Sequence, residues 1–115
     1  MKTTINGLEW EMTQVCAEDS RLRLSNGDLC IGTTREYTLC IAIDKDLPKD
    51  VFLQTVRHEL THAFLISTQL VDKKENFTDE EICEFVAKYG AQIEEISQRF
   101  MREEFAEENS KHGND

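Results

Sequence analysis

The sequence predicts a small α+β domain in which a mostly antiparallel N-terminal sheet packs on two helices. Up to residue 44, apolar residues recur with period two, as in half-buried strands. From residue 49 onward the apolar spacing becomes three and four, as in amphipathic helices. A chain of 115 residues with 39% hydrophobic content has room for one core. We expect residues 1–108 to form this domain, with the second helix fraying from residue 102 and residues 109–115 forming a solvated tail.

The alternating segments that predict strands are short and are separated by turn residues. They are residues 5–16, 21–24, 29–32 and 39–43. Turns are predicted at residues 18–20, 25–28 and 33–36, and Asn26-Gly27 is the strongest hairpin dipeptide among them. On the last strand Cys40 and Ala42 form a face of small residues, where another element can pack closely.

The first helix is predicted over residues 49–68, a stretch without Gly or Pro. Asp46 is a suitable N-cap, and Pro48 suits the first turn because its missing N–H is not needed there. A helical wheel places His58 and His62 away from the apolar arc. That arc consists of Phe52, Leu53, Val56, Leu60, Ala63 and Phe64. We therefore expect a central helix that is buried on one side and presents the His pair on another.

Residues 58–62 read His-Glu-Leu-Thr-His, an instance of His-Glu-x-x-His. Because residues four apart on a helix point the same way, His58 and His62 can place two imidazole nitrogens on one metal ion. Glu59 lies about 100° round the helix, where it can reach a water bound to that ion. The pattern predicts a zinc hydrolase in which Glu59 is the catalytic general base. The alternative is a helix whose two His side chains only make polar contacts.

A catalytic zinc needs a third protein ligand, and the second helix supplies the candidates. The metzincin motif is excluded because Leu65 and Thr68 occupy its Gly and His positions. The only other His, His112, lies in the tail. Glu81 is already accounted for, since Thr78 and Glu81 form a capping box at the start of this helix.

Glu80 and Glu84 remain, on one side of the second helix beside the small residues Cys83 and Ala87. We predict that Glu80 is the third zinc ligand. Glu84 is predicted to accept a hydrogen bond from the free N–H of a zinc-bound His. The alternative for both is a solvated first turn that is stabilised by the helix dipole. The apolar stripe of this helix, over residues 82–100, is predicted to be core.

The composition restricts the partners and the compartment. A formal net charge of −10 argues against a nucleic-acid partner and against an anionic membrane surface. The sequence shows neither a signal peptide nor a membrane-spanning run, so we expect a cytoplasmic protein with reduced thiols. Its four Cys include no Cys-x-x-Cys pair. Cys30 and Cys40 could form a cross-strand disulfide, but small buried thiols are the favoured interpretation.

Three stretches of the chain, residues 39–44, 55–64 and 80–87, resemble the small ImmA/IrrE-like zinc metallopeptidases of prophages and mobile elements. The resemblance covers about residues 28–96 and implies a zincin-like domain of the gluzincin type. It also implies endopeptidase activity on a protein substrate, often a transcriptional repressor. The family's Glu-x-x-x-Asp-type pattern maps its zinc-binding Glu onto Glu80. The family usually has Asp or Asn at the position of Glu84.

The oxyanion donor, the choice of function, the native metal and the oligomeric state stay open at this point. The group that stabilises the oxyanion is unassigned among Tyr37, Tyr89 and Arg57. The resemblance implies that a peptide substrate adds as a strand along an exposed sheet edge. The alternative function is a catalytically weak, zinc-stabilised module that binds another protein. The sequence does not fix the native metal or the oligomeric state.

Overall fold

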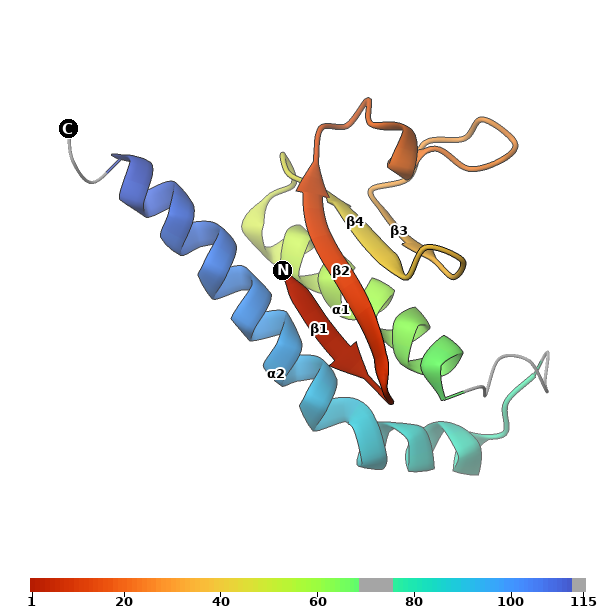
Figure 1. The fold of residues 1–115 in the computed structure, drawn as a ribbon. Helices are drawn as coiled ribbons and strands as arrows, with labels where there is room; N and C mark the ends of the chain where they lie inside the picture. Colours follow the sequence, from red (N-terminus) through yellow and green to blue (C-terminus); the bar gives the residue numbers. More distant parts are fainter. Residues whose placement is uncertain (69–75, 113–115) are drawn as a thin grey trace.

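A four-stranded sheet lies across helix α1 (Lys49–Ser67), and helix α2 (Asp79–His112) runs beside the sheet (Figure 1). The computed structural model describes residues 1–68 and 76–112, and of residues 105–112 only the backbone. The strands are β1 (Lys2–Ile5), β2 (Leu8–Val15), β3 (Gly32–Arg35) and β4 (Cys40–Asp44). A short 3₁₀ helix, η1 (Ser20–Leu22), follows β2. The predicted α+β class is confirmed.

The sheet is mixed, with strand order β1-β2-β4-β3. β1 and β2 form an antiparallel hairpin whose turn residues Asn6 and Gly7 both have positive φ, at 48° and 83°. β2 pairs with β4 in parallel, whereas β3 pairs with β4 in antiparallel. The prediction of a mostly antiparallel sheet therefore holds for two pairs and misses the parallel pair at its centre. β3 forms one edge of the sheet, and this edge flanks α1.

Two of the predicted strands are wrong. Residues 20–22 form η1, and Arg23 and Leu29 make only an isolated bridge rather than a hairpin. The strand lies instead at residues 32–35, where the sequence predicted a turn. The β-branched residues Thr33 and Thr34 favour extended backbone, and this preference outweighed the polar character of the segment.

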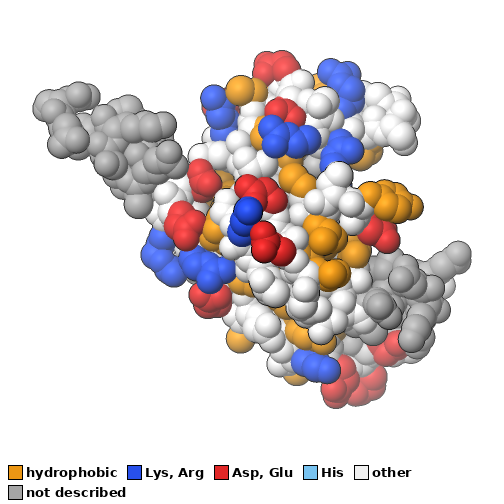
Figure 2. Space-filling model, in the orientation of Figure 1, with side chains coloured by type: hydrophobic (Ala, Val, Ile, Leu, Met, Phe, Trp, Pro, Cys, Tyr) orange, Lys and Arg blue, Asp and Glu red, His pale blue; other side chains and the backbone are white. Residues whose placement is uncertain are grey.

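The two faces of the sheet are covered differently. On one face, Trp10 and Met12 of β2 and Ile41 and Ile43 of β4 pack with α1 in the main core. On the other face, Leu22 of η1 packs against a smaller cluster formed by Val15 and Ala42. Ala42 thus belongs to the small face predicted for this strand. Figure 2 shows the side of the sheet away from α1, where acidic and basic side chains are interspersed rather than gathered by sign.

The start of α1 differs from the prediction, whereas the start of α2 agrees with it. Pro48 is itself the N-cap of α1, and Asp46 donates its backbone N–H to Asp44 Oδ1 instead of capping the helix. At α2 the predicted capping box forms: Glu81 N–H donates to Thr78 Oγ1 at 3.2 Å, and Thr78 N–H donates to Glu81 Oε1 at 3.1 Å. The helical backbone of α2 extends to His112, so residues 109–112 of the predicted tail are helical.

The apolar stripe of α2 is core only in its later part. Ile93, Ile96, Phe100 and Met101 are buried in the main core. Ile82, by contrast, is 51% exposed. Within the described residues, neither helix is long and apolar enough to span a membrane. All four thiols are free, so the structure has no disulfide between Cys30 and Cys40.

Candidate functional site

Glu59 is the buried acid of the molecule's central helix. It is only 6% exposed. Because burying a carboxylate without a hydrogen bond is unfavourable, a partner is expected. The partner is Thr34 of strand β3, whose hydroxyl donates to Glu59 Oε1 at 2.8 Å. The same hydroxyl lies 3.0 Å from the backbone carbonyl oxygen of Glu59. The side chain of the predicted general base is therefore held against the sheet edge.

Gly32 allows strand β3 to approach α1 this closely. A Cβ at Gly32 would lie 2.6 Å from Thr55 Cγ2 and 3.1 Å from Glu59 Cγ. Thr55 donates its hydroxyl to the carbonyl of Val51, and its methyl group contacts the strand. Any larger residue at position 32 would push β3 away from the helix. Gly32 and Thr34 are two residues apart, so both belong to the strand face that meets α1.

The opposite face of β3 is fixed to η1. Thr33 donates its hydroxyl to the carbonyl of Arg21 at 2.6 Å. Arg35 Nη2 donates to three carbonyl oxygens of the same segment at 3.1 to 3.2 Å. The acceptors are the carbonyls of Ser20, Arg21 and Arg23. Edge strands are otherwise bonded to only one neighbour, so these contacts give β3 a second support.

The two His side chains lie together on the exposed side of α1. Both residues are exposed, and the His58 side chain is 67% accessible. Their ring centroids are 5.0 Å apart with the ring planes at 73°. His58 Nε2 lies 3.9 Å from Glu59 Oε2. One helical turn thus presents two accessible imidazoles beside a buried carboxylate, and imidazole nitrogens are ligands that zinc prefers.

A cleft of about 580 Å³ opens beside this group, between α1 and the sheet edge. His58 and Glu59 line it from the helix, and Gly32 lines it from β3. Leu29 and Ile31, in the segment leading into β3, also line it and are 60% and 48% exposed. The cleft therefore offers apolar side chains next to His58 and Glu59.

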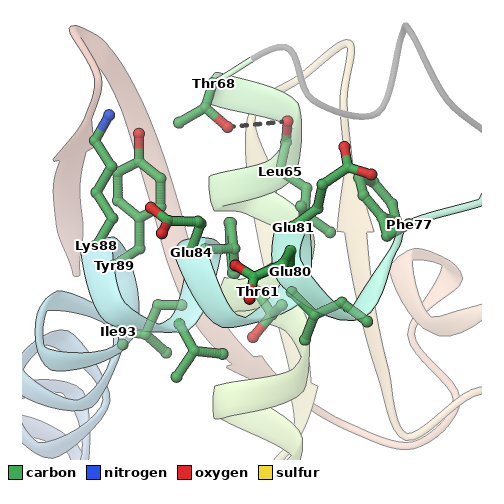
Figure 3. A pocket seen from close by; sticks show the side chains of 14 residues that line it. Thr61, Leu65, Thr68, Phe77, Glu80, Glu81, Glu84, Lys88, Tyr89 and Ile93 are labelled. Carbon is green, nitrogen blue, oxygen red and sulfur yellow. Dashed lines mark hydrogen bonds between the residues drawn. The ribbon is translucent and has the colours of Figure 1, made fainter.

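Glu80 and Glu84 lie on a different groove. Both are exposed in the first turns of α2, and they line a groove of about 780 Å³ together with Thr61 and Leu65 of α1 (Figure 3). Thr61 directly precedes His62. Among the described residues, no three His, Cys, Asp or Glu side chains gather closely enough to hold a metal ion. The structure thus brings together His58, Glu59 and His62, but it does not bring Glu80 or Glu84 to them.

The candidate oxyanion donors are placed unequally. Arg57 donates from Nε and Nη2 to the two carboxylate oxygens of Glu94, both at 2.7 Å. This hydrogen-bonded pair raises the pKa of Arg57 and lowers the pKa of Glu94 to about 2. Tyr37 is 99% exposed in the turn between β3 and β4. Tyr89 packs its ring on those of Phe64 and Phe85 and lines the Glu80 groove.

Gly32 and Thr34 are the site residues that sequence reasoning missed. The sequence predicts that Gly32 ends a short strand and that Thr34 lies in a turn, so it assigns neither residue a role in the site. A Gly followed by two β-branched residues is a usable signal for a strand with a close helix contact. Nothing in the local sequence indicates that Thr34 bonds a residue 25 positions away.

Comparison with known proteins adds no relationship. The chain matches no protein-family model, and it matches neither a curated protein nor a solved structure.

Proposed function

We propose that this protein is a zinc-dependent endopeptidase that hydrolyses a peptide bond in a protein substrate. One observation carries the proposal: a buried, hydrogen-bonded Glu59 lies on the same helical turn as two exposed, adjacent imidazoles. A helix that used its His residues only for polar contacts has no need to bury a carboxylate between them and the sheet.

The proposed zinc ligands are His58, His62 and Glu80. The exposed His pair suits zinc chemically, because zinc accepts imidazole nitrogens and carboxylate oxygens in catalytic sites. Glu80 lines the groove that includes Thr61, the residue before His62. In this proposal the first turns of α2 move towards the His pair when the ion binds. Glu84, which lines the same groove, accepts a hydrogen bond from a ligand His.

Glu59 acts as the general base and then as the general acid. When bound, the zinc ion supplies a more acidic water and polarises the substrate carbonyl. Glu59 takes a proton from the attacking water and delivers it to the nitrogen of the leaving amine. The substrate lies in the cleft between α1 and the β3 edge, where an extended peptide can add as a strand.

The resemblance to ImmA/IrrE-like peptidases supports a regulatory protein, such as a repressor, as the substrate. It also supports a zincin-like fold, with the sheet packed on the active-site helix and its edge beside the cleft. Four free thiols are consistent with a reducing compartment, and we place the protein in the cytoplasm.

A second candidate function is a zinc-stabilised module that binds another protein. The observation that favours it is the apolar groove beside α2, in which Ile82 and Val86 are 51% and 59% exposed. Such a surface is typical of protein contacts. This module has no use for the buried carboxylate of Glu59, and we therefore prefer the peptidase.

The deciding experiment compares Glu59→Gln with Glu94→Gln and wild type in a zinc-supplemented cleavage assay on a mixed protein substrate. We expect Glu59→Gln to lower cleavage by roughly 10²- to 10⁴-fold, because the base is lost while its shape is kept. Glu94→Gln removes a carboxylate from the neighbouring helix and should leave cleavage unchanged. Cleavage that does not depend on Glu59, or no cleavage by wild type, would favour the binding module.

A further inference from the structure

We infer that Thr34 is a positioning residue, which anchors one oxygen of Glu59 so that the other oxygen acts as the base. This inference rests on the proposed function. The two carboxylate oxygens have different surroundings. Oε1 accepts the Thr34 hydroxyl at 2.8 Å, whereas Oε2 is the oxygen measured 3.9 Å from His58 Nε2. The oxygen on the His side is therefore the one available to exchange protons.

The anchor matters because a glutamate side chain has three rotatable bonds. A free Glu59 would sample several orientations, and holding it in one removes that entropy before the reaction begins. Thr34 can serve as the anchor because its own strand is supported on both faces. Gly32 allows contact with α1, and Thr33 and Arg35 bond the carbonyls of the η1 segment.

The proton inventory is consistent with this division of the two oxygens. The attacking water loses a proton to Oε2, which leaves Glu59 as a neutral carboxylic acid. That proton then moves from Oε2 to the nitrogen of the leaving amine as the peptide C–N bond breaks. Oε1 is a hydrogen-bond acceptor in both protonation states, so Thr34 can keep its hydrogen bond throughout the cycle.

The test compares Thr34→Val, Thr34→Ser and wild type. Val has the shape of Thr but no hydroxyl, whereas Ser keeps the hydroxyl and loses the methyl group. We expect Thr34→Val to lower kcat roughly 10- to 100-fold with KM unchanged, since orientation is lost and substrate contacts are kept. Thr34→Ser should recover most of kcat. Thermal unfolding of each variant checks that the fold is intact.

A second readout does not depend on activity. The infrared carboxylate band of Glu59, assigned by its loss in Glu59→Gln of ¹³C-glutamate-labelled protein, should shift in Thr34→Val and return in Thr34→Ser. An unshifted band, or Glu59-dependent cleavage with wild-type kcat in Thr34→Val, would overturn the inference and leave the proposed function standing. Absence of Glu59-dependent cleavage in wild type would instead overturn the proposed function, and the band would still show whether Thr34 holds Glu59.

Discussion

The acidic residues on the two sides of the His pair differ in burial and in hydrogen bonding. On the sheet side, Glu59 is buried, bonded to Thr34 and packed where Gly32 admits the helix. On the α2 side, Glu80 and Glu84 are exposed on a groove and stand apart from the imidazoles. The packing of the fold thus holds the proposed base, Glu59, in place in the absence of a metal ion. The proposed third ligand, Glu80, would have to move towards the His pair when the ion binds.

The difference has a physical reason. The later part of α2 is tied to the core by Ile93, Ile96 and Phe100 and to α1 by the Arg57–Glu94 pair. Its first turns have no comparable burial. Segments with little buried apolar area are the ones that reorganise at low free-energy cost. A metal ligand on such a segment could move with the ion, but a general base needs a fixed place.

The largest expected effect is a difference in stability between substitutions in the later part of α2 and substitutions in its first turns. Phe100 is fully buried and stacks on Phe52 with ring centroids 6.0 Å apart. Phe100→Ala should therefore lower the free energy of unfolding by about 3–5 kcal/mol. Ile82→Ala, on the exposed first turns, should lower it by less than about 1 kcal/mol. Urea unfolding measures both values, and similar losses would show that the first turns are packed as firmly as the rest.

A smaller effect should come from the contact at Gly32. Gly32→Ala places a Cβ 2.6 Å from Thr55 Cγ2, and we expect a loss of about 1–3 kcal/mol in the free energy of unfolding. Thr55→Ser removes that methyl group, so the double variant Gly32→Ala/Thr55→Ser should regain part of the loss. Chemical denaturation of the four proteins in this cycle tests it. Strictly additive effects would mean that the two residues do not press on each other.

The smallest expected effect concerns the Arg57–Glu94 ion pair, which joins α1 to the later part of α2. Hydrogen bonds from Arg57 and then from Gln98 lower the pKa of Glu94 to about 2, from an ordinary value of 4.5. A carboxyl whose pKa is lowered on folding stabilises the protein above the unfolded pKa, and loses that effect as the pH falls through the folded one. Wild type should therefore lose slightly more stability than Glu94→Gln between pH 4.5 and pH 2. Because both side chains are 44% exposed, the difference should be small. Parallel melting-temperature curves for the two proteins over this range would contradict the assignment.

The two helices and the capping box of the second one could be predicted from the sequence, whereas the predicted N-cap of the first, Asp46, is wrong. The helix that carries His58 and His62 and the capping box of Thr78 and Glu81 are found as expected, because both depend on residues close in sequence. The burial of Glu59 against Thr34 could not be predicted. It depends on β3, whose extended backbone is fixed by pairing with β4 rather than by its own sequence. Whether Glu80 can reach the His pair depends on tertiary packing, which helical spacing alone does not determine.

The central claim is that His58, His62 and Glu80 hold one zinc ion, with Glu59 left free. The most direct test is the metal content of protein purified without added zinc. Wild type would be compared with His58→Ala, Glu80→Ala and Glu59→Gln, and with Glu103→Ala as a control for losing an exposed acid from α2. We predict one zinc per chain in wild type, Glu59→Gln and Glu103→Ala, and its loss in His58→Ala and Glu80→Ala. Wild type without zinc, or zinc that is retained in either His58→Ala or Glu80→Ala, would contradict the claim.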